Sequence, residues 1–338
     1  MTTRRQLIQA AAAAVLGVSA RGLVRAQTGT PDPLLAIPGP GRMRAVLDTD
    51  TFNEIDDQYA LAYSLLSPER MAVEAIYAAP FVNDRSRSAA EGMEKSYEEI
   101  QRLLNFFPKV DRRIALRGSG RFLEQKNRPV DSPAARDLIE RALKPADGPL
   151  YVLTIGCPVN VSSAILMEPK IKQKIVVVWL GGTPAYWPSA SEFNLQQDVI
   201  ASQVLFDSGV PLVQVPTKNV SEHLRTTVPE LERHLRGRSR IGDYLYGQFL
   251  QYFAERVKPD QGRDFPWSKV IWDISAVAWL KNPAWVPSRI VPSPVLTEDM
   301  HWQNAAGRHN IRVATSVDRD AIFNDVFSRL SRLDEQAR

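Results

Sequence analysis

The chain has 338 residues, of which 44% are hydrophobic, with 42 basic and 38 acidic side chains and a formal net charge of +4. All charged residues in the first 26 positions are arginines, four in number, so residues 27–338 carry a net charge of zero. No basic stripe with interleaved aromatic residues stands out, which argues against a nucleic-acid partner. The one cysteine, Cys157, cannot form an internal disulfide, so the fold must be stable from its core alone.

Residues 1–26 have the order of features typical of a twin-arginine export signal. Arg4 and Arg5 precede a mild apolar run from Ala10 to Ala20, and Val24-Arg25-Ala26 offers small residues at a cleavage point. The apolar run is too short to span a membrane. A basic amphipathic N-terminal helix is the alternative interpretation. We expect a periplasmic or secreted protein that has no membrane attachment once the signal is removed.

Residues 27–41 are rich in Pro and Gly and predict a linker or irregular N-terminal arm, followed by a single domain over 42–338. In that domain short apolar runs alternate with helical patterns. Continuous apolar runs are typical of strands buried on both faces, and their alternation with helices favours a parallel sheet. The expected strands, in chain order, lie near 45–47, 71–77, 113–116, 150–155, 175–180 and 212–215, with helices at 58–66 and about 86–107.

The expected fold class is therefore α/β, with an open, mainly parallel sheet, helices on both faces and a Rossmann-like core. Residues 228–257 have a more charged helical pattern and predict a helical subdomain or a lid. A further helix is expected to begin near Trp272-Asp273 and to end at the Pro-rich segment 282–294.

Five acidic residues fall within ten positions at the end of the first expected strand: Asp48, Asp50, Glu54, Asp56 and Asp57. They repel one another unless a positive group lies among them. One or two could cap the following helix, but capping does not explain an Asp-x-Asp pair together with an Asp-Asp pair. Open α/β sheets bind ligands at the carboxyl ends of their strands, and carboxylates are preferred ligands of Ca²⁺ and Mg²⁺. The cluster predicts a metal or polar-substrate site.

Two more loops carry candidate residues. The long loop from Gly181 to Asn194 follows another expected strand and ends in Glu192-Phe193-Asn194, although Glu192 and Asn194 would be weak signals alone. Asp273, preceded by Trp272, would on its own be interpreted as a favourable charge at a helix N-terminus rather than as a ligand.

Other catalytic motifs are weak. Cys157 has no histidine near it in sequence, and small buried cysteines are common, so a catalytic cysteine is not expected. The four histidines are too scattered for a zinc motif. His223 follows a strand directly and is kept as a distant candidate acid.

Taken in order, these motifs resemble the inosine-uridine-preferring nucleoside hydrolases. The similarity runs through most of the chain beyond the signal and rests on Asp48-Thr49-Asp50 with Asp56-Asp57, Asn83, the Gly-x-x-x-Asn turn at 156–160, the Gly-Gly loop ending in Glu192-Phe193-Asn194, and Asp273. The resemblance implies calcium-dependent hydrolysis of the N-glycosidic bond of a ribonucleoside, giving ribose and free base. It also implies a homo-oligomer, a dimer or a tetramer.

The resemblance assigns roles residue by residue. It implies that Ca²⁺ is held by Asp50, Asp57, Asp273 and the backbone carbonyl of Val159, where the family usually has threonine. Asp50 also matches the general base that deprotonates a calcium-bound water. The expected substrate contacts are Asp56, Asn83, Glu192, Asn194, Trp272 and Asp273. The chemistry is reasonable for these residue types, because carboxylates stabilise a sugar oxocarbenium ion and a cation acidifies its water.

The chain departs from the family pattern at two places. The turn between the acid pairs, 51–55, is two residues longer than the usual Pro-Gly-x and carries Glu54, which is expected to face the site or to form a structural ion pair. Trp272 stands where a histidine commonly helps the base to depart. The leaving-group acid is therefore unassigned, and Trp272, Trp187 or Tyr186 could stack on a base.

Two other functions are compatible with the sequence. Asp48-Thr49-Asp50-Thr51 is similar to the first motif of haloacid-dehalogenase-type phosphatases, in which the first aspartate is the nucleophile, although the later Gly-Asp-x-x-x-Asp motif is not found. An exported ribose- or nucleoside-binding protein could use the same calcium site without turnover.

Overall fold

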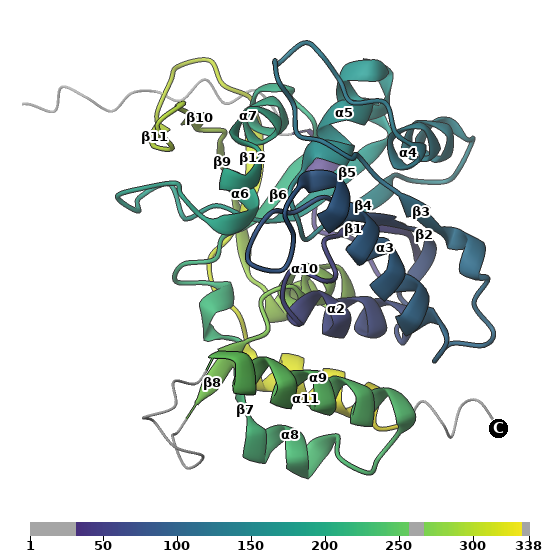
Figure 1. Ribbon diagram of the computed structural model, residues 1–338. Coiled ribbons are helices and arrows are strands. Elements are labelled where there is room, and N and C mark those ends of the chain that lie inside the picture. Colours follow the sequence, from purple (N-terminus) through teal and green to yellow (C-terminus); the bar gives the residue numbers. More distant parts are fainter. Residues whose placement is uncertain (1–31, 257–266, 333–338) are drawn as a thin grey trace, which may run out of the picture. The chain divides into compact units, whose positions relative to one another are not determined.

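The computed structural model describes residues 32–256 and 267–332. The expected signal peptide, 1–26, and the first residues of the expected arm lie outside the described residues. An eight-stranded sheet forms the centre, with strand order β3-β2-β1-β4-β5-β6-β12-β9 (Figure 1). Its strands, in that order, are Ala115–Arg117, Met71–Ala78, Met43–Thr49, Leu150–Thr154, Ile175–Leu180, Leu212–Val215, Asn310–Ala314 and Ser288–Pro292.

The sheet is parallel except at one edge, where β9 runs antiparallel to β12. This confirms the expected α/β class. Each of the first six strands in the chain was predicted by an apolar run. The signal is clearest for β4 and β5, because both are buried at every position and their apolar residues do not alternate with exposed polar ones. β9 and β12 were missed, because Arg312 and the exposed positions of β9 interrupt their apolar pattern.

The order of the strands in the sheet predicts where a ligand-binding site lies. β1, β2 and β3 proceed toward one edge, whereas β4, β5 and β6 proceed toward the other, so the direction of winding changes between β1 and β4. Open α/β sheets bind ligands in the crevice at such a switch point, outside the carboxyl ends of the strands. The acidic cluster extends from the end of β1 to the first turn of α2, and residues 156–160 lead from β4 into α5.

Helices cover both faces of the sheet. In β1, Ala45 and Leu47 join one apolar cluster while Val46 joins the other, as expected for side chains that alternate between the faces. The first cluster includes residues of α2, α3, α9, α10 and α11, and the second includes residues of α4, α5 and α7. The helices are α2 Asp56–Leu65, α3 Ala89–Leu104, α4 Pro133–Leu143, α5 Val159–Met167, α6 Phe193–Gln197, α7 Val199–Asp207, α8 Val228–His234, α9 Arg240–Arg256, α10 Ile274–Lys281 and α11 Arg319–Leu330.

The expected helical subdomain consists of α8 and α9 and shares the main core. Leu245 and Phe249 of α9 belong to the first apolar cluster, and the Tyr59 hydroxyl on α2 donates to the Leu245 carbonyl at 3.1 Å. Two short antiparallel pairs complete the fold: β7 (Arg225–Thr227) with β8 (Ser268–Val270), and β10 (Val295–Leu296) with β11 (Trp302–Gln303).

The described part of the expected N-terminal arm packs on the domain. Pro33–Leu35 forms a short 3-10 helix, η1, whose N-cap is Asp32. The Leu35 side chain is buried, and its carbonyl accepts from Arg312 Nε at 2.8 Å. Within the described residues, no helix combines the length and the apolar character needed to cross a membrane.

Candidate active site

A pocket of about 500 Å³ opens at the carboxyl ends of the central strands. Its wall includes residues of the loops after β1, β2, β5 and β6, together with α9 and the start of α10. Eight of the sequence-predicted site residues line it: Asp50, Asp56, Asp57, Asn83, Glu192, Asn194, Trp272 and Asp273. Segments more than 200 residues apart in the chain therefore meet where the sequence predicted a site.

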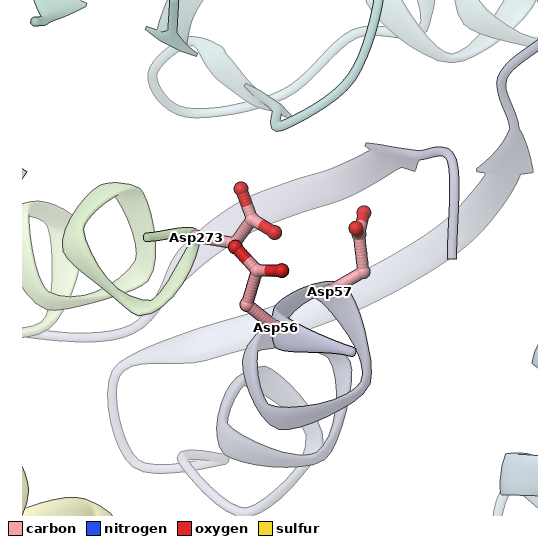
Figure 2. A group of neighbouring side chains, drawn as sticks. All are labelled: Asp56, Asp57 and Asp273. Carbon is pink, nitrogen blue, oxygen red and sulfur yellow. The ribbon is translucent and has the colours of Figure 1, made fainter. Parts of the chain in front are cut away.

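Three of the carboxylates that line this pocket lie close together (Figure 2). Asp56 and Asp57 occupy the first turn of α2, and Asp273 is the N-cap residue of α10. Each offers a carboxylate oxygen, and these oxygens all lie within 4.8 Å of one another. Two helix N-termini thus converge on one group of acids, and their partial positive charges favour the ionised forms.

Asp50 lies beside this group at the end of β1. It is buried, and neither of its carboxylate oxygens has a hydrogen-bond partner in the described part of the chain. Gly156 packs against it, since a Cβ at position 156 would lie 3.0 Å from the Asp50 Cγ. Buried carboxylates without partners are costly, so these oxygens and the three-acid group fit a divalent cation bound by oxygen ligands.

Burial and mutual repulsion shift the protonation of these acids. Burial, then the charges of Asp57 and Asp56, raise the pKa of Asp50 well above its ordinary value. Burial and the Asp56 charge raise the pKa of Asp57 to about 7. Burial, then the charges of Asp57, Asp56 and Asp50, raise the pKa of Asp273 well above its usual range. A bound cation would reverse these shifts by favouring the charged forms.

Val159, the expected carbonyl ligand, begins α5 and is fully buried. It is not among the residues that line the pocket. Its part in a metal site stays a prediction.

Asp48 is a support beneath the site. It is fully buried and does not line the pocket, and its Oδ1 accepts from Asn160 Nδ2 at 2.9 Å. Asn160 Oδ1 in turn accepts from the Ser119 backbone N–H at 2.7 Å, which ties the end of β1 and the loop after β3 to the start of α5. A phosphatase nucleophile must be reachable from the pocket, so the haloacid-dehalogenase interpretation has no support at Asp48.

Two threonines also support the acids, and sequence reasoning missed their role. Asp57 Oδ1 accepts a short hydrogen bond from the Thr49 hydroxyl. The Thr49 and Thr51 hydroxyl oxygens lie 3.0 Å apart. Their position beside the acidic residues in the sequence was the available signal.

Glu192 and Asn194 are held by the backbone around them. Glu192 is the N-cap of α6 and accepts from the Asn194 N–H at 3.1 Å and from the Gly182 N–H at 2.8 Å. Asn194 Nδ2 donates to the carbonyls of Ile155 and Leu180 at 2.9 and 3.0 Å, joining the ends of β4 and β5. Burial raises the pKa of Glu192 to about 7, although these backbone hydrogen bonds act to lower it. Both residues are thus preorganised in the pocket wall.

The longer turn provides two further pocket residues. Asn53 accepts from Asn83 Nδ2 at 2.6 Å through its Oδ1, which fixes the Asn83 amide in the wall. Glu54 forms the expected ion pair, with Lys269 Nζ at 2.6 Å from its Oε2, and it also lines the pocket. Lys269 lies on β8, more than 200 residues away in sequence, so no local signal predicted it.

The described lining of the pocket contains no histidine. His223 is exposed and is not part of the wall. Tyr186 and Trp187 are 67% and 36% exposed and do not line the pocket either, so stacking of these two on a bound base is not supported. Trp272 and Phe193 do line it and can contact an apolar ring, and Tyr252 lines it as well.

The fold and this site define an α/β enzyme whose pocket lies at a topological switch point and is lined by carboxylates that could hold a cation. A family model described as "Inosine-uridine preferring nucleoside hydrolase" matches residues 45–324. The chain belongs to this family, and it is a hydrolase that acts on N-glycosyl bonds.

Individual relatives are distant. Pyrimidine-specific ribonucleoside hydrolases RihA of Salmonella paratyphi A and Salmonella typhimurium are each 25% identical over 254 residues, covering 68% of this chain and 76% of theirs. Among solved structures, a plant nucleoside hydrolase has a TM-score of 0.67 and a purine-preferring ribonucleoside hydrolase from Gardnerella vaginalis one of 0.64. Each is 20% identical and covers 87% of this chain and 99% of its own, which supports the same fold.

Proposed function

We propose that this protein is a calcium-dependent ribonucleoside hydrolase that releases ribose and a free base. The observation that carries the proposal is the meeting of Asp56, Asp57 and Asp273 beside the unpartnered, buried carboxylate of Asp50. Hard cations prefer such oxygen ligands, and a site rich in carboxylates suits Ca²⁺.

In this proposal Asp50, Asp57 and Asp273 hold the cation, with the Val159 carbonyl as a further ligand. The bound cation would lower the pKa of a water molecule and so supply a nucleophile near neutral pH. Asp50 takes the proton from the attacking water, because its oxygens have no competing partner in the described chain.

The other pocket residues bind and orient the sugar. Asp56, Asn83, Glu192 and Asn194 contact its hydroxyl groups, and Asp273 adds a further acceptor. As the C–N bond breaks, positive charge develops on the sugar ring and the surrounding carboxylates stabilise it. Trp272 and Phe193 contact the base. These assignments rest on the lining of the pocket and on the resemblance to the family.

The setting of the enzyme is also proposed. The order of features in residues 1–26 supports export through the twin-arginine route to the periplasm or the medium. We infer a homo-oligomer, a dimer or a tetramer, from the resemblance to the family, with no nucleic-acid or membrane partner.

A product assay tests the function. The calcium-loaded protein is incubated with a panel of purine and pyrimidine ribonucleosides and a generic phosphate ester, and free ribose and phosphate are measured. We expect ribose release that is lost in Asp50→Asn and kept in the control Asp147→Asn, an exposed site away from the pocket. Phosphate release instead would indicate a phosphatase. Saturable binding of a nucleoside without either product would indicate a binding protein.

A further inference from the structure

Glu54, Lys269 and Tyr252 form a hydrogen-bonded polar group at one wall of the pocket. Lys269 is 8% exposed and does not line the pocket, whereas Glu54 and Tyr252 do. The two carboxylate oxygens of Glu54 are both occupied, one by Lys269 Nζ at 2.6 Å and the other by the Tyr252 hydroxyl at 2.5 Å. The Glu54 side chain is therefore fixed from two directions.

The Lys269 ammonium is fixed as well. Besides the bond to Glu54, it donates to the Val270 carbonyl at 3.0 Å, and it lies 5.5 Å from the centre of the Tyr252 ring. The Lys269 ammonium also lies 3.5 Å from Asp56 Oδ1. A lysine side chain loses much conformational freedom in such an arrangement, so the ammonium is a rigid positive group beside an acid of the pocket.

Asp56 is consequently held at both oxygens. Oδ1 faces the Lys269 ammonium, and Oδ2 accepts from the Trp272 backbone N–H at 3.1 Å. A carboxylate has about four acceptor positions, so the lone pairs directed into the pocket stay available while the group itself cannot rotate. Hydrogen bonds to ionised groups are strong when their geometry is fixed in advance.

We propose that Lys269 is a positioning residue: fixed by Glu54 and Tyr252, its ammonium holds Asp56 in the orientation that accepts hydrogen bonds from the hydroxyl groups of the ribosyl substrate. The proposal rests on the proposed function and explains the longer turn, since the turn brings Glu54 to the ammonium. Lys269 acts through Asp56 and does not itself touch the substrate.

The test compares Lys269→Met with Lys281→Met. Lys281 is a matched control, because its side chain is 10% exposed and pairs with a glutamate, Glu69, away from the pocket. We expect the KM for a ribonucleoside to rise about tenfold or more in Lys269→Met, the size of one lost interaction with a charged group, with a smaller change in kcat. Lys281→Met should keep the wild-type KM. Equal KM values in the two variants would overturn the proposal.

A double-mutant cycle shows whether the effect passes through Asp56. If it does, Lys269→Met should change KM far less in an Asp56→Asn background than in the wild type, because contacting residues that act together are not additive. If the double variant instead shows a KM raised by the full product of the two single-variant effects, the proposal is contradicted. If Lys269→Met does not fold, Lys269→Gln keeps a donor at this position without the charge and should raise KM in the same direction.

A binding measurement separates this proposal from the function on which it rests. Wild-type protein that releases no ribose would contradict the proposed activity alone. The Kd for the nucleoside then decides the role of Lys269: weakening of about tenfold in Lys269→Met supports it, and equal Kd values in Lys269→Met and Lys281→Met overturn it.

Discussion

At the scale of single residues, the surroundings of Asp50 matter most. Its carboxylate is free of protein partners in the described chain, and the space beside it is kept open by a glycine. A methyl group at Gly156 would lie 3.0 Å from Asp50 Cγ and Oδ1 and 3.1 Å from its backbone nitrogen. Either the turn or the carboxylate must shift to accept it.

Gly156→Ala should therefore reduce activity by about tenfold or more, since small displacements in a catalytic site are costly. Gly247→Ala is the control, because a Cβ at that exposed position on α9 meets nothing within 4 Å. The control should keep full activity and gain a few tenths to ~1 kcal/mol of stability. Steady-state kinetics on both proteins check this, and full activity in Gly156→Ala would contradict the tight packing.

The acids also predict a pH dependence for the metal-free protein. Asp57 has an ordinary pKa of 3.8 and a pKa of about 7 in the fold, so the folded state binds more protons between these values. Stability should then fall as pH rises through this window. Urea unfolding of chelator-treated protein between pH 4 and pH 7 measures it. The slope should be smaller in Asp57→Asn, and stability that rises across the window would contradict the assignment.

At the scale of elements, the carboxyl ends of the strands are joined by side chains from the loops. Asn160 receives the Ser119 N–H and donates to Asp48 and, at 3.4 Å, to the Ala78 carbonyl, so one amide holds the ends of β1, β2 and β3. Local sequence predicts the strands themselves but not the hydrogen bonds by which Asn160 connects their ends. The Gly-x-x-x-Asn spacing marked the residue without indicating its partners.

Asn160→Ala should lower the free energy of unfolding by about 2–4 kcal/mol, because it removes a partner of a buried carboxylate and leaves a cavity. Asn105→Ala, at the exposed C-terminus of α3, is the comparison and should cost less than ~0.5 kcal/mol. Chemical denaturation of the two variants measures the difference. Similar costs would mean that Asn160 does not hold the loops together.

How far the sequence predicts each element depends on the range of the contacts that form it. The strand β5 is buried at every position, so the apolar run Ile175–Leu180 alone predicted both of its ends correctly. The acids after β1 were recognised because they are adjacent in sequence. Lys269 and Tyr252 reach Glu54 only through the tertiary fold, and the capping role of Glu192 depends on the conformation of its own loop.

At the scale of the whole molecule, the site unites the two halves of the sheet with the helical subdomain. The acids come from β1, α2 and α10, and Tyr252 comes from α9, so substrate and cation would contact elements from across residues 50–273. A cation bound only by the folded protein must stabilise it by mass action. The melting temperature of chelator-treated protein should therefore rise as Ca²⁺ is added. The rise should be much smaller in Asp273→Asn.

The central claim is that the carboxylate group performs nucleoside hydrolysis with one bound cation. The most direct measurement follows ribose release and bound calcium together while Ca²⁺ is titrated into chelator-treated protein. We predict that activity rises in proportion to occupancy and reaches its limit at one calcium per chain, and that Asp57→Asn loses both. Full ribose release by the chelated protein, or unchanged calcium binding and activity in Asp57→Asn, would contradict the account.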